Sequence, residues 1–393
     1  MILVLVFGAA LLVAVLLSGV AARSVLSTSL LFLVAGAVVG DGVLGWIHVT
    51  PDSEIVSTAA DLALFTVLFT DGAKLRRLRG EGGWQGPVRA LGIGMPLTFA
   101  LVALLAHYLA GLDWIPALLA GAVLAPTDPV FASAIVSRTD VPDRLRRLLS
   151  IESGLNDGLA LPVVLLLLAS TGFVSPEEPT SVPRVLLELG TGVGLGVVAP
   201  LVAWALFRIP GLGVTPRLQP LGPVALAVTI YGSADVLGAN AYLAAFVGGA
   251  LFGALAPSAH EAFEPLGDQL SELSKFAALL VFGAVLTPML FTSVSAGAWA
   301  VAVLTLVLAR PLAVALSLSG HTVDRTELFT AAWFGPKGFA SVVYGLLVLH
   351  SGTAEAEQVY GLVAVTIALS IVVHSSTDIP VARLFRAREA EGV

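Results

Sequence analysis

Two prolines flank a threonine and an aspartate inside a long apolar stretch, and this is the first pattern in the sequence that could do chemistry. The stretch 114–137 contains Pro-Thr-Asp-Pro at positions 126–129. Each proline removes a backbone N–H and clashes with the carbonyl group four residues earlier, and Asp128 itself precedes a proline, which disfavours helical backbone angles. The pattern predicts a broken helix whose free carbonyl groups and helix ends lie beside a carboxylate, as in the cation sites of transporters. A simple proline kink, with Asp128 capping the second half-helix, is the alternative.

A second group of polar residues lies in the next apolar stretch, 144–170. Positions 152–158 read Glu-Ser-Gly-Leu-Asn-Asp-Gly, in which four polar side chains form two i,i+4 pairs on a helix: Glu152 with Asn156, and Ser153 with Asp157. Asp157 lies about 20 Å from the start of the stretch at 1.5 Å per residue, a depth similar to that of Asp128. A charge at this depth costs about 2.5–3.5 kcal/mol even on the mildest scale, so the two carboxylates predict a functional cavity. A purely structural polar network is the alternative.

Two basic residues also lie at mid-depth. Lys337 belongs to a Gly-Pro-Lys-Gly motif that should break its own helix. A buried lysine needs a carboxylate partner, and we predict Glu152, with Asp157 as the second choice; a lysine that snorkels to the interface is the alternative. Arg310 is permanently charged, so we predict that it forms an ion pair or binds carbonyl groups.

Two further acids lie in the stretch 53–72. Asp71 ends this stretch and either collects cations at the mouth of a funnel or is an ordinary acid at a helix end. Asp61 lies inside the stretch without an evident partner. None of the six histidines has the spacing of a metal site.

The elements that position these residues must cross a membrane. Hydrophobic residues make up 57% of the 393 residues and charged residues 12%, about half of the roughly 25% typical of soluble proteins. The absence of cysteine excludes a Cys-ligated zinc site and a cysteine nucleophile, and a net charge of -7 without a long basic run gives no sign of nucleic-acid binding. We predict an all-α polytopic membrane protein with 13 transmembrane segments, at 2–21, 25–40, 53–72, 87–111, 114–137, 144–170, 182–207, 220–237, 240–256, 275–291, 296–318, 326–350 and 357–379.

No loop is long enough for a soluble domain, so we predict that residues 1–393 form one membrane domain. We read the first stretch as a membrane helix because no basic residue precedes its apolar core, as one would in a signal peptide.

Loop charges predict the orientation. Most basic residues follow odd-numbered segments, and the positive-inside rule places those loops in the cytoplasm. We therefore predict an outer N-terminus and a cytoplasmic C-terminus, with Lys275 at one of the cytoplasmic junctions. Three tryptophans then lie at outer helix ends: Trp46, Trp114 and Trp299.

Three motifs resemble those of the sodium/proton exchanger (NhaP-like) family of monovalent cation:proton antiporters: Pro-Thr-Asp-Pro, Glu-Ser-Gly-Leu-Asn-Asp-Gly and Gly-Pro-Lys-Gly. Segment number, topology and motif order also agree with that family over nearly the whole chain. The resemblance implies two inverted repeats with broken crossing helices, and a homodimer. It also implies a moving core domain, with elements at 87–170 and 296–379, and a dimer domain, with elements among 1–72 and 182–256.

The resemblance further implies a role for each residue of the site. Asp157 would be the carboxylate that binds cation and proton in turn. Thr127 and Ser153 would help to ligate the monovalent cation, while Asp128 and Asn156 would organise the site.

Other positions follow the family pattern less closely. Glu152 would pair with the basic residue of the late motif, where many relatives carry Arg and this chain has Lys337. Asp71 matches an acid that some relatives place at the end of this helix. Asn before the key Asp is associated in the family with electroneutral, one-for-one exchange.

The sequence thus predicts a secondary antiporter, not an enzyme, that exchanges Na⁺, with K⁺ or Li⁺ as alternatives, for H⁺. It would need no cofactor and would serve pH homeostasis as an integral protein of a prokaryotic plasma membrane. An intramembrane aspartyl protease is one alternative, because two aspartates lie on consecutive segments, but the Asn-Asp pair and the buried lysine do not fit it. A cation channel is another, but no repeated filter sequence occurs.

Overall fold

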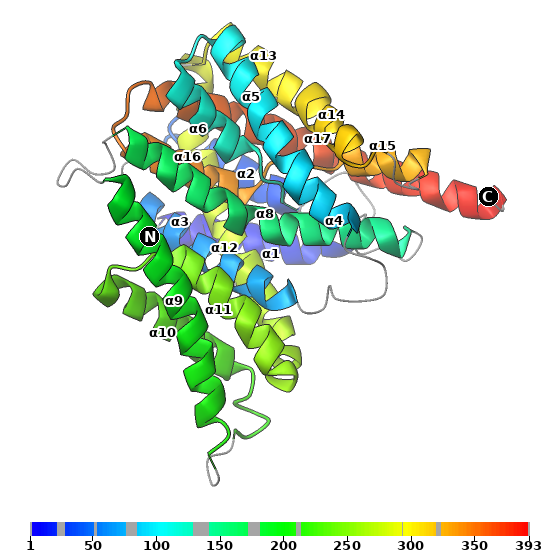
Figure 1. Ribbon diagram of the computed structural model, residues 1–393. Helices are drawn as coiled ribbons and strands as arrows, with labels where there is room; N and C mark the ends of the chain where they lie inside the picture. The colour runs from blue at the N-terminus through cyan, green and yellow to red at the C-terminus, as the bar shows by residue number, and fades with distance from the viewer. Residues whose placement is uncertain are drawn as a thin grey trace.

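The computed structural model describes residues 2–21, 28–50, 53–75, 85–128, 141–171, 181–209, 214–292, 294–319 and 324–391. Within these ranges the regular elements are all helices (Figure 1). They are α1 (Ile2–Ala21), α2 (Thr28–Val39), α3 (Glu54–Lys74), α4 (Gln85–Arg89), the π-helical turn η2 (Ala90–Gly94), α5 (Met95–Ala110), α6 (Trp114–Leu124), α8 (Asp143–Ser170), α9 (Val182–Leu206), α10 (Leu221–Leu237), α11 (Ala241–Leu255), α12 (Pro257–Thr292), α13 (Ala296–Leu304), the π-helical turn η4 (Thr305–Ala309), α14 (Arg310–Ser317), α15 (Arg325–Trp333), α16 (Phe339–His350) and α17 (Ala356–Glu391).

These helices confirm the predicted membrane architecture. In the described ranges, 8 helices are long and apolar enough to cross a membrane, and five shorter apolar helices account for the remaining predicted segments. Two predicted segments are parts of longer helices: 275–291 is the second half of α12, which begins at Pro257, and 357–379 is the first part of α17, which ends at Glu391. The end of the predicted segment 114–137, from residue 129 onwards, lies outside the described residues.

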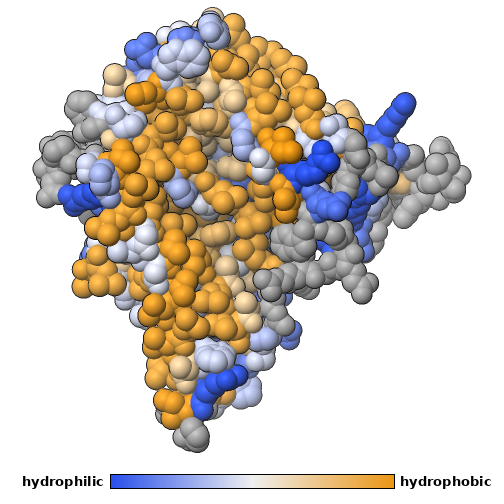
Figure 2. Space-filling view, in the orientation of Figure 1, coloured by the Kyte–Doolittle hydropathy of each residue, from blue (hydrophilic) through white to orange (hydrophobic). Residues whose placement is uncertain are grey.

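The exterior is suited to lipid. Figure 2 shows hydrophobic residues covering most of one face, with hydrophilic residues gathered towards its edges. Leu5 and Leu16 of α1 are each 72% exposed, and Leu187 of α9 is 66% exposed. In a bilayer such side chains meet acyl chains and not water, so their exposure has no hydrophobic cost.

The chain contains two inverted repeats, and each repeats the same packing features. Helix α3 of the first repeat packs against α11 of the second. In the corresponding pair, α12 of the second repeat packs against α2 of the first. Each repeat also has a π-helical turn, η2 or η4, before its broken span. The break follows α6 in the first repeat and separates α15 from α16 in the second.

Glycines allow the two cross-repeat pairs to approach closely. A Cβ at Gly249 of α11 would lie 2.1 Å from the Phe69 carbonyl oxygen of α3, and one at Gly283 of α12 would lie 2.1 Å from the Leu33 carbonyl oxygen of α2. Neither position has room for a side chain. Glycine thus lets the two backbones approach closely, and such packing holds membrane helices together in the absence of a hydrophobic driving force.

The packed helices fall into two groups at opposite ends of Figure 1. One end holds α5, α6 and α13, and the other holds α9, α10 and α11. The first group packs further against α16 and α17, and the second against α3. The helix α8 touches both groups, through α6 on one side and through α3, α9 and α11 on the other.

The glycine contacts predict a position-specific loss of stability. Gly249→Ala should lower stability by about 1–3 kcal/mol, because its methyl group would overlap the α3 backbone. The matched control is Gly190→Ala in α9, where nothing lies within 4 Å of the added carbon. Thermal unfolding in detergent measures both variants, and an equal effect of the two would contradict the packing described here.

Candidate functional site

The two broken spans cross and are joined through their backbones. The N–H of Asp128, four residues beyond the end of α6, donates a hydrogen bond of 2.8 Å to the carbonyl oxygen of Pro336, in the break between α15 and α16. The Ser341 hydroxyl of α16 donates to the Val123 carbonyl group of α6 at 2.7 Å. A Cβ at Gly338 would collide with the Asp128 side chain. The Gly-Pro-Lys-Gly motif therefore breaks its own helix and also leaves room for the other span to cross there.

Asp128 is buried and held by two donors. The N–H of Phe339, at the start of α16, lies 3.3 Å from Oδ2, and Lys275 Nζ lies 3.5 Å from Oδ1. Both side chains of the Asp128–Lys275 pair are at most 7% exposed. The positive end of the α16 dipole and the ammonium group thus both offset this carboxylate.

The location predicted for Lys275, at a cytoplasmic junction, is wrong. The polar stretch before it continues as helix, so Lys275 lies about 27 Å into α12, with apolar residues after it. Lys337 is singled out in the sequence because a basic residue lies within an apolar run. Lys275 also adjoins a continuous apolar run, so the same criterion could have identified it.

The Thr127 backbone and hydroxyl organise the neighbouring helix α8. Ser153 Oγ donates to the Thr127 carbonyl oxygen at 2.8 Å. Asn156 Nδ2 donates to the same carbonyl oxygen at 3.1 Å and to Thr127 Oγ1 at 2.8 Å. The structure therefore brings together these three predicted residues. Among the described residues, the buried Asn156 Oδ1 has no hydrogen-bond donor, which leaves it able to ligate a cation.

Asp157 differs from the other buried acids. It is 6% exposed, and its carboxylate has no ion pair or hydrogen bond with any residue in the described part of the chain. Its backbone carbonyl group accepts a 2.8 Å hydrogen bond from the Tyr344 hydroxyl. Asp128 and Lys275 lie within electrostatic range. A buried carboxylate without a partner is unstable unless it binds a proton or a cation.

The predicted ion pair between Glu152 and Lys337 is wrong. Glu152 Oε1 instead lies 2.6 Å from Nη1 of Arg310, with both side chains at most 4% exposed. Arg310 begins α14, after the π-helical turn, and its side chain also lies against Gly335, where a Cβ would collide with it. The prediction that Arg310 forms an ion pair is thus confirmed.

Lys337 has a different role from the one expected. Its Nζ donates to the carbonyl groups of Pro126 at 3.2 Å and Ala125 at 3.4 Å, beyond the end of α6. Its own backbone N–H donates to Ser370 Oγ of α17 at 2.7 Å. Lys337 therefore satisfies carbonyl groups that the first break exposes. Its own backbone is held by α17.

Asp71 lies on the approach to the buried acids. Its carboxylate is 3.8 Å from Lys74 Nζ, and Lys74 also pairs with Asp268 of α12 at 2.7 Å. Lys275 and Asp128 are within electrostatic range of Asp71. The geometry suits either an accessory acid or a helix-end charge, the two readings that the sequence left open.

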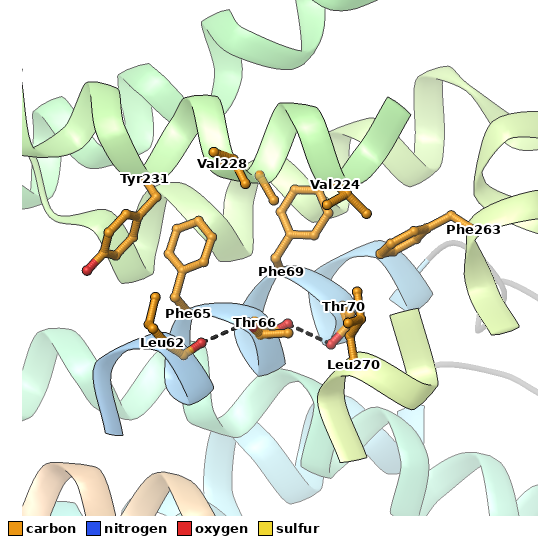
Figure 3. A pocket seen from close by; sticks show the side chains of 11 residues that line it. Leu62, Phe65, Thr66, Phe69, Thr70, Val224, Val228, Tyr231, Phe263 and Leu270 are labelled. Carbon is orange, nitrogen blue, oxygen red and sulfur yellow. Dashed lines mark hydrogen bonds between the residues drawn. The ribbon is translucent and has the colours of Figure 1, made fainter. Parts of the chain in front are cut away.

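An apolar cavity of about 270 Å³ lies beside α3, α10 and α12, apart from these acids. Figure 3 shows its aromatic lining, with Phe65, Phe69, Tyr231 and Phe263 around the space. The hydroxyl of Thr66 donates to a carbonyl group within α3, so the cavity offers an ion no free ligand from this residue.

Comparison with known proteins identifies the family. The family described as "Sodium/hydrogen exchanger, transmembrane" matches residues 8–384. The chain belongs to the sodium/hydrogen exchanger family. The K(+)/H(+) antiporter NhaP2 of Shewanella sp. (strain MR-4) is 25% identical over 375 residues, covering 95% of this chain and 65% of its own length. The K(+)/H(+) antiporter NhaP of Alkalimonas amylolytica is 26% identical over 387 residues, covering 97% of this chain and 66% of its own length.

A solved structure shares the fold of this chain. The sodium proton antiporter MjNhaP1 from Methanocaldococcus jannaschii, at pH 8, superimposes with a TM-score of 0.77 and 20% identity, covering 97% of this chain and 98% of that one. The chain spans about two thirds of the length of the NhaP and NhaP2 relatives.

The buried pair predicts a large loss of stability when one partner is removed. Arg310→Met leaves Glu152 without its partner in the protein's interior, which should cost about 3–5 kcal/mol. The double variant with Glu152→Leu should recover part of that loss. Thermal unfolding in detergent or nanodiscs measures each variant.

Arg184→Met is the matched control. Arg184 pairs with Glu188 at 3.2 Å, but the two side chains are 53% and 36% exposed, so its loss should cost about 1 kcal/mol or less. A protein that tolerates Arg310→Met as well as Arg184→Met would contradict the assigned pair.

Proposed function

We propose that this exchanger carries a monovalent cation across the membrane in one direction and a proton in the other. The observation that carries the proposal is Asp157, a buried carboxylate without a protein partner beside the unsatisfied Asn156 Oδ1. Oxygen ligands suit a hard cation. The relatives named above are K(+)/H(+) antiporters, and the Na(+)/H(+) antiporter 2 of Zygosaccharomyces rouxii is 29% identical over 339 residues. Na⁺ is our first choice of substrate, with K⁺ or Li⁺ as alternatives.

Competition for one carboxylate is the proposed mechanism. Asp157 binds either a proton or a cation, and Thr127 and Ser153 add oxygen ligands as they leave their present hydrogen bonds. Moving the bare anion through the membrane would bury an uncompensated charge, which is far more costly than moving either loaded form. Exchange is therefore obligatory.

The charges around the site support one cation per proton. Glu152 is neutralised by Arg310, and Asp128 by Lys275. Asn156 cannot ionise, so Asp157 has no second free carboxylate next to it. A site with one exchanging carboxylate has the same charge whether it holds a proton or a monovalent cation.

The two helix groups suggest how the site moves. We propose that the elements at 87–170 and 296–379 form a core domain and that elements among 1–72 and 182–256 form the dimer domain of a homodimer. The bacterial relatives suggest a plasma-membrane location and a role in pH homeostasis. The exposure of Trp46 and Trp114 fits an outer aromatic belt and hence an outer N-terminus.

The alternatives are less well supported. A protease of the aspartyl type needs two carboxylates that share a proton, whereas the Asp128 carboxylate contacts Lys275 and the N-terminus of α16. A channel filter needs a ring of repeated ligands, whereas the oxygen atoms here come from unlike residues on α8 and in the break after α6.

Replacing the central acid tests the proposed function directly. Asp157→Asn should abolish cation-driven proton movement in proteoliposomes that contain a pH dye, because the amide binds neither a proton nor a cation as a carboxylate does. The exposed Asp235→Asn in α10 makes the same chemical change outside the site and should retain exchange. Coupled exchange by folded Asp157→Asn protein would refute the role of Asp157.

A membrane voltage tests the stoichiometry. A clamped potential is worth about 2.3 kcal/mol per charge per 100 mV, so an electroneutral carrier should reach the same Na⁺ distribution at 0 and 100 mV. Valinomycin and a K⁺ gradient set the potential for a Na⁺ measurement. An equilibrium that shifts with voltage would show that more than one proton moves per cation.

A further inference from the structure

A second acid on α3 lies on the side of the site away from Asp71. Asp61 precedes Asp71 by ten residues, or about 15 Å along the helix. It is partly buried, and its Oδ1 accepts a 2.5 Å hydrogen bond from the Tyr242 hydroxyl of α11. The site described above uses neither residue, although an ionised acid inside a membrane is costly to retain without a function.

Polar groups continue from this pair towards Asp157. Tyr344 of α16 is fully buried and donates to the Asp157 carbonyl oxygen at 2.8 Å. The helices that carry these residues contact one another, since α8 and α16 both pack against α3, and α11 packs against α3 and α8. The Asp61–Tyr242 pair and the Tyr344–Asp157 pair therefore lie on helices that pack together in the interior.

An aromatic ring closes this side of the central acid. Phe246 lies one turn after Tyr242 in α11, and a Cβ at Gly158 of α8 would be 2.9 Å from its ring. Gly158 directly follows Asp157 in the chain. Gly154, one turn earlier on the same helix, would have nothing within 4 Å of its Cβ. The Phe246 ring therefore packs tightly against α8 at the residue that follows Asp157, whereas Gly154 has no such neighbour.

We propose that Asp61, held by Tyr242, is the residue that loads the cation from the face of the membrane at which α3 begins, and that Phe246 against Gly158 is the seal between it and Asp157. This inference rests on the proposed function and extends it to a second access path. A carboxylate at the mouth of that path attracts a partly dehydrated monovalent cation, and its neutral hydroxyl partner orients it without cancelling its charge. Separation of α11 from α8 would move the ring off Gly158 and connect the two acids.

Side-specific kinetics test the assignment. The exchanger is reconstituted in one orientation, and the KM for Na⁺ is measured at each face, with K⁺ and Li⁺ as further probes. Asp61→Asn should raise the KM at the face where α3 begins by about fivefold or more and leave the KM at the opposite face within about twofold. Asp61→Glu should restore the first KM because it keeps the charge.

A charge control separates the path from the surface. Glu188→Gln removes a partly exposed acid of α9 that pairs with Arg184 and should leave both KM values unchanged. An Asp61→Asn variant that changes both faces equally, or neither, would overturn the inference. Absence of exchange by the unmodified protein with all three cations would instead overturn the proposed function, and this inference with it.

Thiol labelling gives a second measurement that does not depend on transport. The chain has no cysteine, so single substitutions report without background. A membrane-impermeant maleimide should label Tyr242→Cys only from the face where α3 begins, and Gly154→Cys only from the opposite face. Labelling of both positions from one face would overturn the proposed path.

Discussion

A charge inside a membrane must be neutralised or hydrogen-bonded, and this constraint determines the arrangement of nearly every polar residue in the interior. Glu152 is neutralised by Arg310, and Asp128 by Lys275 and the start of α16, while Lys337 donates hydrogen bonds to carbonyl groups beyond α6. The broken helices meet the same requirement, because their free backbone groups can pair with buried charges, which the backbone of an intact helix cannot do. Among the described acids of the site, Asp157 lacks such a partner, which is why we propose that the transported ion binds there.

Hydropathy and proline positions predicted most of the fold, because both act locally. Twenty apolar residues span a bilayer wherever they occur, and Pro-Thr-Asp-Pro breaks a helix whatever packs against it. Pairings could not be predicted in the same way. The identity of the partner of Glu152 depends on how α14 meets α8, and Arg310 reaches it from a helix that starts after a π-helical turn. The same limit applies to Asp61, since only the packing of α3 on α11 brings Tyr242 to it.

Two glycines in the second break make this packing possible. Gly338 allows the second break to lie against Asp128, and Gly335 allows the Arg310 side chain to pass. A single added carbon at either position would overlap a charged group of the site. The motif Gly-Pro-Lys-Gly is therefore a geometric requirement for two separate ion contacts, beyond its effect in ending α15.

The question of stoichiometry depends on the two buried lysines near Asp157, Lys275 and Lys337. Arginine stays protonated in proteins, so the pair formed by Arg310 keeps its charge throughout a cycle. Lysine can titrate when buried, but Lys337 contacts carbonyl groups, which an uncharged amine can also satisfy as a donor, and no carboxylate releases or captures its proton directly. Lys275 contacts Asp128 and lies within electrostatic range of Asp157. Lys337 lies within electrostatic range of Asp157 as well, but of these two lysines only Lys275 has a carboxylate in contact with its ammonium proton. Electroneutral exchange requires that the Asp128–Lys275 pair keep that proton, and the contact between the two, together with the Phe339 N–H that holds Asp128 in place, is the feature of the structure that opposes its loss.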